Sequence, residues 1–450
     1  MPAEELVRQL WHAYCLSTEA DPRIVATRDI EPDTTLFEIP RPGIINVQTS
    51  HLPSRLPGIF DKDGQPLNDE EGVPKLDSWS SLILVMIYEY LRGAESSWKP
   101  YFDVLPEAFN TPMFWSNEEV EELQASPARA KIGKADAEEM FRAHILPVIR
   151  SNPDVFSRAE SHSDDDLISL AHRMGSTIMA YAFDLENEDG QEENEEEEWV
   201  EDRDGKTMMG MVPMADILNA DAEFNAHINH GDESLTATSL RTIKAGEEVL
   251  NYYGPHPNSE LLRRYGYVTE KHSRYDVVEI PWFLVEEALA EQLAIALETV
   301  EAIRRDLDED ELEDTFVLER ESGEPNPDGT FATQASLSDM PGDLREQLKE
   351  FLKAIKKLQP ESIPDKRKRD EVQQAVLLRV LQKLGARYTT SSTEDALLLQ
   401  QNGLPERSRM AAQVRLGEKK LLQEAIALMD AATDRPTEED SSSKRAKTSA

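Results

Sequence analysis

Three stretches of the chain combine Asn, Asp and Tyr residues that could bind or orient a ligand. They are Met-Val-Pro-Met-Ala-Asp-Ile-Leu-Asn-Ala-Asp at 211–221, Gly-Glu-Glu-Val-Leu-Asn-Tyr-Tyr-Gly at 246–254, and Asn-Ser-Glu-Leu-Leu-Arg-Arg-Tyr-Gly-Tyr-Val at 258–268. Tyrosine offers a rigid apolar ring and one hydroxyl that can orient a bound group. Taken alone, these residue types favour core tyrosines beside a capping aspartate, and a binding site is the alternative.

Other chemistries find little support in the sequence. The chain lacks the glycine-rich motifs of phosphate loops and dinucleotide-binding folds, and it lacks the Gly-x-Ser-x-Gly turn of serine hydrolases. His227, His230 and Asp232 are close enough in sequence to suggest a metal site. A turn-rich polar segment more often leaves such side chains facing water, so we predict no metal.

The charge of the chain restricts its partners. It has 48 Lys and Arg against 88 Asp and Glu, which gives a formal net charge of −40. Because nucleic-acid binding needs a basic surface, this balance argues against direct contact with nucleic acid and favours a basic protein partner. Cys15 is the single cysteine, which excludes an internal disulfide framework and a zinc cluster of several thiolates.

The sequence predicts an intracellular protein that does not enter a membrane. No signal peptide is visible, and the longest apolar run, Leu82 to Tyr88, is far shorter than the ~20 residues that span a bilayer. Basic runs at 366–369 and 444–447 could be nuclear-localisation signals. We therefore expect the nucleus, with the cytoplasm as the alternative. The first run could also simply start a helix, and the second could be a solubilising tail.

Hydrophobic patterning predicts a β-region split by helices. Strands are expected near 24–27 and 35–39, and again at 235–243 and 249–253. Helices are expected between 77 and 150, with one starting at Asn117, and at 167–183. Similar turn-then-strand patterns at 30–37 and 243–250 suggest two parts of one β-domain.

Acidic and helical segments occupy the remainder of the chain. Residues 186–204 hold 12 Asp or Glu among 19 residues, so we expect a disordered loop. After Pro281 the pattern is helical: apolar residues recur at positions 285, 289, 293 and 297, and further helices are expected at 344–358 and 372–384. Residues 306–334 should form a loop, and the chain after Asp430 a disordered tail.

The three stretches at 211–221, 246–254 and 258–268 together resemble the SET-domain protein lysine methyltransferases, in the branch of the Rubisco methyltransferases. Segments at 98–102, 112–115, 179–183 and 410–422 are also similar to this branch, and the resemblance covers roughly residues 20–430. It implies an α+β fold with three parts. These are a β-rich SET domain at 1–280 with a helical insert at about 47–207, an all-α substrate-binding domain at 281–430, and a disordered tail at 431–450.

The same resemblance implies roles for individual residues. Tyr253 matches the catalytic tyrosine, with Tyr252 as its rival, and the cofactor is S-adenosyl-L-methionine. Cofactor contacts are implied for Tyr181, Asn219, Ala220 and Tyr265, and substrate contacts for Trp79, Asp216 and Tyr267. Because position 267 is a tyrosine, the resemblance favours monomethylation.

Two positions depart from the family pattern. Asp21, Pro22 and Arg23 stand where the family has a Gly-x-Gly cofactor loop, and Ala220 replaces a histidine. Glycine lets the backbone approach a ligand closely, so Asp, Pro and Arg should crowd the cofactor. We therefore expect either a weakened cofactor site or an N-terminal sequence that is not the native one.

Methyl transfer to lysine needs a neutral amine, which an aromatic, desolvated channel favours. It requires neither a metal nor a nucleophilic side chain. Carboxylates in the channel would oppose it, so the acidic run at 186–204 should lie outside, where it steers a basic substrate or serves only as a solvated linker. The leading hypothesis is a methyltransferase that acts on a large-subunit ribosomal protein. The alternatives are the same enzyme acting on a histone or transcription factor, and a non-catalytic lysine-peptide binder.

Overall fold

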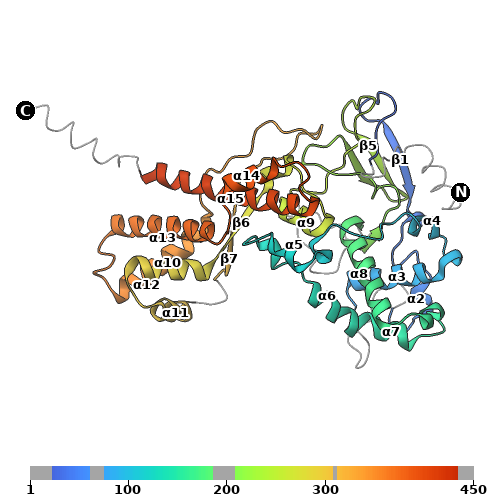
Figure 1. Ribbon diagram of the computed structural model, residues 1–450, viewed down its shortest axis with the longest axis horizontal. Helices are drawn as coiled ribbons and strands as arrows, with labels where there is room; N and C mark the ends of the chain where they lie inside the picture. Colours follow the sequence, from blue (N-terminus) through green and yellow to red (C-terminus); the bar gives the residue numbers. More distant parts are fainter. Residues whose placement is uncertain (1–22, 61–75, 186–207, 308–311, 434–450) are drawn as a thin grey trace, which may run out of the picture.

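The computed structural model describes residues 23–60, 76–185, 208–307 and 312–433. In Figure 1 the strands Thr35–Pro40 and Ser234–Ser239 lie at one end of the elongated molecule and helices of the C-terminal part at the other, with the strands Val277–Pro281 and Thr315–Glu319 between them. Asp21, Pro22, the acidic run at 186–204 and the basic run at 444–447 lie outside the described residues. None of the described helices is long and apolar enough to cross a membrane.

A three-stranded antiparallel sheet joins the two halves of the β-region. Its order is β1–β5–β4, formed by β1 (Thr35–Pro40), β5 (Ser234–Ser239) and β4 (Ala226–His230). Because β1 precedes the helical insert and β4 and β5 follow it, this pairing confirms the prediction of one split β-domain. Isolated bridges Val25↔Glu248 and Ile30↔Ile243 extend the pairing.

Three predicted strands of this region are wrong in extent. The segments at 24–27 and 249–253 form only isolated bridges, and β5 ends at Ser239 rather than at residue 243. Their apolar side chains are still buried in the same core: Ile24, Ile243 and Val249 are each less than 10% exposed. Hydrophobic patterning therefore identified the buried residues correctly but could not show how far backbone pairing continues.

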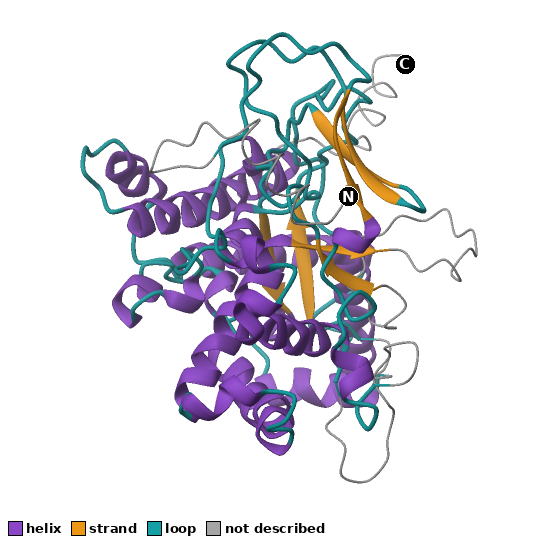
Figure 2. Ribbon diagram, turned by 90° about the vertical axis from the view of Figure 1, so that its right-hand side faces the viewer, coloured by secondary structure: helices purple, strands orange, loops and turns teal. Residues whose placement is uncertain are grey.

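The helical insert has an apolar core of its own, which Ile45 and Met211 of the β-region also join. Its helices are α2 (Leu52–Arg55), α3 (Ser78–Arg92), α4 (Lys99–Phe102), α5 (Asn117–Glu121), α6 (Lys134–Met140), α7 (Leu146–Ser151) and α8 (Asp164–Tyr181). In Figure 2 one group of strands stands clear of the helices at the upper right, and the other strands lie among helices near the centre. Every residue from Leu82 to Ile87 in α3 is at most 1% exposed, so α3 is the centre of this core.

Local capping explains where these helices begin. Ser163 and Asp166 form a capping box at the start of α8, which satisfies backbone N–H groups that have no partner in the helix. The predicted helix at Asn117 exists, but Ser116 is its N-cap and Glu119 completes the box. After α8 the chain enters β2 (Ala182–Leu185), which pairs with β3 (Met208–Met211), so the helix expected to reach Phe183 ends earlier.

The C-terminal part is mostly helical. It holds α10 (Trp282–Leu293), α11 (Leu297–Asp306), α12 (Gly342–Leu358), α13 (Lys366–Ala386), α14 (Ser392–Leu399) and α15 (Glu406–Thr433). The predicted loop at 306–334 is wrong in part, because β7 (Thr315–Glu319) lies inside it and pairs with β6 (Val277–Pro281). The apolar repeat is also interrupted, since α10 ends at Leu293 and Leu297 starts a new helix.

Helix α15 connects the C-terminal part to the insert. Trp115 and Leu123 of the insert pack against Met410 and Val414 of α15 in one apolar cluster. The Arg407 guanidinium donates to Glu119 at 2.8 Å. These contacts hold the C-terminal helices against the region that carries the candidate site.

Candidate active site

Backbone pairing brings the stretches at 211–221 and 246–254 together. The Asn251 N–H donates to the Asn219 carbonyl at 2.8 Å, and the Asp221 N–H donates to the Asn251 carbonyl at 3.3 Å. Ala220 and Asn251 thereby form a parallel bridge. The residues that flank Ala220 in the first stretch therefore lie beside those that flank Asn251 in the second.

Three tyrosines form one surface next to the bridge. The Tyr253 hydroxyl donates to the Leu218 carbonyl at 2.6 Å, and the Tyr267 hydroxyl donates to the Ala220 carbonyl at 3.2 Å. The Tyr253 ring stacks on Tyr265 with centroids 4.9 Å apart, and Tyr265 lies 6.1 Å from Tyr267. All three tyrosines are largely buried and keep partial exposure.

Tyr265 is placed by the helix α9 (Asn258–Tyr265), of which it is the last residue. Two leucines of α9, Leu261 and Leu262, are fully buried and fix the helix against its neighbours.

Burial raises the pKa of Tyr253 first of all, and the neighbouring Tyr267 and Tyr265 add to this effect. The hydroxyl of Tyr253 therefore stays protonated at neutral pH.

Tyr252 points away from this surface. Its ring stacks on Phe224 with centroids 4.7 Å apart, and its hydroxyl lies 3.2 Å from that of Tyr275. Adjacent residues of an extended segment point to opposite sides. Of the two rival tyrosines, the structure thus places Tyr253, and not Tyr252, in the cluster with Tyr265 and Tyr267.

Asp216 is a buried carboxyl beside the tyrosines. Its Oδ2 accepts a hydrogen bond of 2.6 Å from the Tyr101 hydroxyl, and its Oδ1 is buried without a hydrogen-bond partner among the described residues. Burial raises the pKa of Asp216 to about 7, although the Tyr101 hydrogen bond acts in the opposite direction. Burial, followed by the charge of Asp216, raises the pKa of Tyr181, the last residue of α8.

Of the other predicted site residues, Ala220 contacts the cluster directly. The Asn219 amide donates to Glu248 at 2.7 Å, and Ala220 contributes its carbonyl to Tyr267. Trp79 lies in the insert, where its ring is 5.9 Å from that of Phe141. Arg23 is exposed at the start of the described chain.

Sequence reasoning missed Tyr101 as a member of the site. Tyr101 lies in α4 and is 4% exposed, and it meets Asp216 across 115 residues of sequence. A buried carboxyl needs a hydrogen-bond donor, but nothing in the sequence says which donor will reach it. The fold alone brings this pair together.

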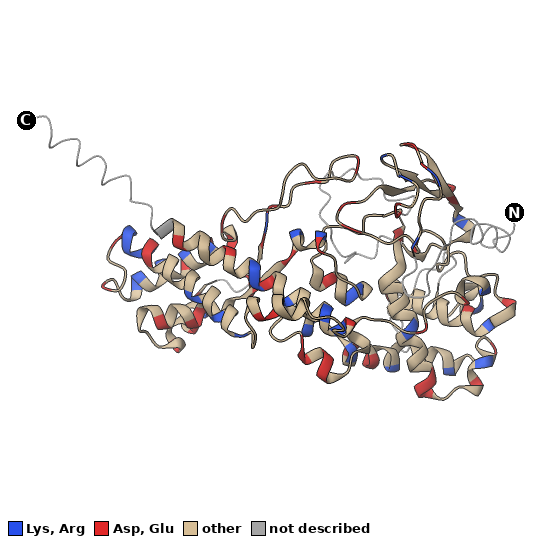
Figure 3. Cartoon of the chain, turned by 45° about the horizontal axis from the view of Figure 1, so that its top comes forward, with Lys and Arg blue, Asp and Glu red and all other residues tan. Residues whose placement is uncertain are grey.

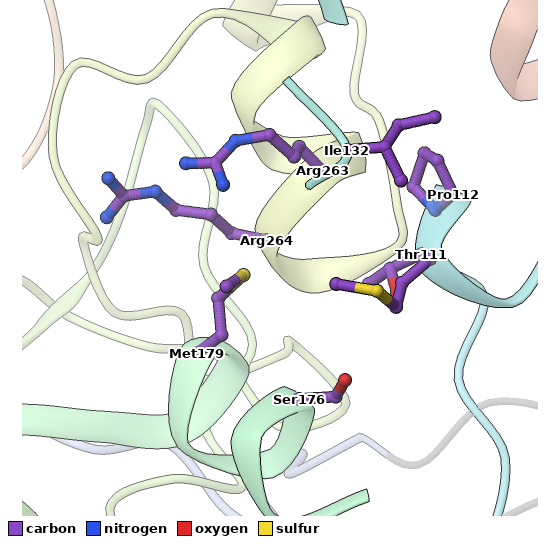
Figure 4. A pocket seen from close by; sticks show the side chains of 8 residues that line it. Thr111, Pro112, Ile132, Ser176, Met179, Arg263 and Arg264 are labelled. Carbon is purple, nitrogen blue, oxygen red and sulfur yellow. The ribbon is translucent and has the colours of Figure 1, made fainter. Parts of the chain in front are cut away.

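Two cavities adjoin other described residues, and neither is lined by Tyr253, Tyr265, Tyr267 or Asp216. One of about 290 Å³ is bounded by residues 24–37 together with Met214 and Val249. A much smaller one, about 10 Å³, lies between α8 and α9. Figure 4 shows Ser176 and Met179 from α8 beneath Arg263 and Arg264 from α9.

The chemistry of the cluster suits a cationic ligand. Aromatic faces attract cations, and the Asp216 carboxyl adds a negative charge to the extent that it is ionised. Among the described residues no group of three His, Cys, Asp or Glu side chains is placed to hold a metal ion. His227 and His230 lie on β4 with exposed side chains, rather than on the loop expected from the sequence.

Family comparisons agree with this architecture. Residues 23–254 match the family model described as SET domain, and residues 287–422 match the model described as Rubisco LSMT substrate-binding. The first match ends directly after Tyr253, and the second covers most of the C-terminal helices.

Curated relatives are similar over part of their length. Ribosomal lysine N-methyltransferase 4 of Saccharomyces cerevisiae is 40% identical over 278 residues, which are 60% of this chain and 53% of that protein. N-lysine methyltransferase setd6 of Xenopus laevis is 32% identical over 251 residues, 54% of this chain and 50% of that protein. The chain thus spans about half the length of the curated relatives it matches.

A solved structure has the same fold. The SET domain of LSMT bound to lysine and AdoHcy has a TM-score of 0.60 at 19% identity, covering 96% of this chain and 91% of that one. At this identity the likeness concerns the fold alone, which is α+β with a helical C-terminal domain as expected. Because the SET model matches more than half of its residues, the chain belongs to the SET-domain family.

Proposed function

We propose that this protein is an S-adenosylmethionine-dependent protein-lysine N-methyltransferase in which Tyr253 is the catalytic tyrosine. The observation that carries the proposal is the surface of Tyr253, Tyr265 and Tyr267. Two of its hydroxyls are bonded to main-chain carbonyls, and the charge of Asp216 adds to the raised pKa of Tyr253. Relatives named as lysine methyltransferases in yeast and in vertebrates support the same reaction class.

The residues present fit the proposed cofactor. S-adenosylmethionine, when bound, supplies an electrophilic methyl group carried on a positively charged sulfonium. The buried Oδ1 of Asp216, which has no partner among the described residues, suits such a cation. Tyr181, Asn219, Ala220 and Tyr265 remain the residues that we propose to hold it, together with the segment at 21–23.

The aromatic surface also suits the acceptor amine. A lysine with its ordinary pKa of ~10.4 must lose its proton before it can attack, at a cost of about 4–5 kcal/mol at pH 7. Desolvation between rings lowers this cost. Asp216 lies inside the site although we expected carboxylates outside it, and its raised pKa limits how much negative charge it carries near neutral pH.

A basic protein is the proposed substrate, and a large-subunit ribosomal protein is the first choice. The net charge of −40 favours a basic partner, and the yeast relative is named for its action on the ribosome. The match of residues 287–422 to a substrate-binding family supports a protein substrate held by the C-terminal helices. A histone or a transcription factor is the alternative.

Monomethylation is proposed from Tyr267. The resemblance to the family favours this outcome because position 267 is a tyrosine, and the hydrogen bond from its hydroxyl to the Ala220 carbonyl helps to hold the ring in the cluster. The acidic run at 186–204 is proposed to steer the basic substrate from outside the site.

A nuclear location is proposed, with the cytoplasm as the alternative. Lys366 to Arg369 form the first turn of α13, capped by Asp365, so they do start a helix. Figure 3 shows such basic residues interspersed with acidic ones along the helices. A fluorescent fusion in which the four residues are replaced by Gln should lose nuclear enrichment.

Incubation of the purified chain with labelled S-adenosylmethionine and a ribosomal protein extract tests the function. Label on one small basic protein supports the ribosomal substrate, whereas label on histones alone supports the alternative. Calorimetric titration with the cofactor separates both from a non-catalytic lysine-peptide binder, which would bind peptide without binding S-adenosylmethionine. That last result would overturn the proposal.

A further inference from the structure

A loop of the C-terminal part packs against the strand segment that carries Tyr253. It comprises residues 320–341, between β7 and α12, and we call it the docking loop. Its base is closed by two backbone hydrogen bonds between Glu321 and Ser336. Its tip reaches the SET domain at Phe224, whose N–H donates to the Gly329 carbonyl at 3.1 Å.

The contact at Phe224 continues directly to the candidate catalytic residue. The Phe224 ring stacks on Tyr252 with an interplanar angle of 19°, and Tyr252 is the residue before Tyr253. On the other side of the backbone, Tyr253 stacks on Tyr265. Residues 252 and 253 are therefore held between two aromatic stacks, one of which rests on the docking loop.

Arg274 provides a second anchor for the loop. Its guanidinium carbon lies 3.3 Å from the centroid of the Phe331 ring, and it donates to the carbonyls of Ser322 and Thr333. The neighbouring Tyr275 lies within hydrogen-bond distance of Tyr252. The docking loop thus reaches Tyr252 by two routes. One runs from Gly329 through Phe224, and the other runs through Arg274 and its neighbour Tyr275.

We propose that the docking loop is a positioning element for Tyr253, an inference that rests on the proposed function. The loop lies within residues 287–422, which match the substrate-binding family, yet it holds the backbone of the reacting segment through Phe224 and Tyr252. Displacement of a reacting group by about 1 Å can cost ~100-fold in rate. The C-terminal part therefore helps to position Tyr253 within the tyrosine cluster.

Gly329 makes the proposal testable, because a side chain there would strike the SET domain. A Cβ on Gly329 would lie 2.2 Å from the Phe224 carbonyl oxygen. Gly323, in the same loop, is a matched control. Gly329 has φ +78° and Gly323 has φ +65°, so alanine is strained at both, but a Cβ on Gly323 has nothing within 4 Å. A difference in activity or in hydrogen exchange between the two alanine variants can then be attributed to the contact between Gly329 and Phe224.

The experiment compares Gly329→Ala with Gly323→Ala and the unchanged full chain. We expect Gly329→Ala to lower kcat at least ~10-fold, with KM for the protein substrate and the affinity for S-adenosylmethionine within about twofold of those of Gly323→Ala. Hydrogen exchange measured by mass spectrometry should accelerate at residues 250–254 in Gly329→Ala only. A purely structural role would instead lower the unfolding temperature without this split between kcat and KM.

Equal kcat values and equal exchange at 250–254 in the two variants would overturn the proposal. If Gly329→Ala does not fold, Phe331→Leu provides the same test, because it removes the ring under Arg274 without adding a clash. The exchange measurement needs no turnover. A wild-type protein that neither transfers methyl groups nor binds S-adenosylmethionine would refute the proposed function. The exchange result would still decide whether the docking loop holds residues 250–254.

Discussion

The Tyr253 hydroxyl donates a 2.6 Å hydrogen bond to the main-chain carbonyl of Leu218, 35 residues earlier in the chain. A hydroxyl has one proton and two lone pairs, so this bond commits the proton and leaves the oxygen as an acceptor toward the site. Such an oxygen can orient an N–H group of an amine that lies against the ring. The geometry therefore suits the role proposed for Tyr253.

Replacing Asp216 with Asn should change how stability depends on pH. The pKa of Asp216 is raised from 3.8 to about 7 by burial, so the folded protein holds this proton more tightly than the unfolded chain does. The contribution of protonated Asp216 to stability is thus complete below pH ~4 and is lost as the pH rises through ~7. The free energy of unfolding of the wild type minus that of Asp216→Asn should fall by about 4 kcal/mol between pH 4 and 8.

Denaturant titrations at a series of pH values measure this difference. Asp276 and Glu418 also have raised pKa values because of burial, but both are present in the two proteins and their effects cancel. A difference that stays constant, or that grows with pH, would show that Asp216 is not buried in this way.

Gly417 in α15 should not tolerate a side chain. A Cβ there would lie 2.0 Å from Oδ2 of Asp276, a buried carboxyl held by Asn258. We expect Gly417→Ala to lower the free energy of unfolding by about 2 kcal/mol or more, as overpacking of a core does. In Gly385→Ala, also within a helix and with nothing within 4 Å, alanine should be neutral or stabilising by up to about 1 kcal/mol.

If the contact between α15 and Asp276 is correct, thermal and chemical unfolding will show a clear loss of stability in Gly417→Ala and no loss in Gly385→Ala. Equal behaviour of the two would contradict the packing of α15 against the segment that follows α9.

Asp395 should be essential to the stability of the C-terminal part. Its carboxyl, 1% exposed, pairs with Arg415 and Lys419, whose side chains are 4% and 6% exposed. Asp395→Ala would leave two buried cations without their partner, at a cost of about 3–5 kcal/mol. Glu346→Ala, which breaks a solvent-exposed pair with Lys349, should have little effect on stability, because water and salt screen such a pair. Denaturant midpoints measure both, and similar losses in the two variants would contradict the buried network.

Much of the fold follows from local patterns in the sequence. The helices α3, α12 and α13 were predicted because their apolar residues recur at helical spacing and cover buried faces. The strand β7 was missed because Thr315–Glu319 sits among acidic, proline-rich segments, although its residues alternate between buried and exposed. The acidic, proline-rich composition of the region favoured a loop. The alternation covers only five residues and indicates a strand only once its pairing with β6 is known.

The site was predicted less completely, for a physical reason. Tyr253, Tyr265 and Tyr267 lie close in sequence, so a resemblance of motifs could name them together. The partner of Asp216, Tyr101, and the partner of Tyr252, Phe224, come from other elements of the fold. Such contacts depend on how distant segments pack, which no local pattern encodes.

Methyl transfer by Tyr253→Phe and Tyr252→Phe, measured side by side, tests the central claim most directly. Both variants lose one hydroxyl and keep the ring, and only Tyr253 belongs to the cluster with Tyr265. With labelled S-adenosylmethionine and a ribosomal protein extract, we expect Tyr253→Phe to lose about 100-fold or more of the wild-type rate. Tyr252→Phe should stay within about tenfold of it, with both variants folded and binding cofactor. Full activity of Tyr253→Phe, or a larger loss in Tyr252→Phe, would contradict the account.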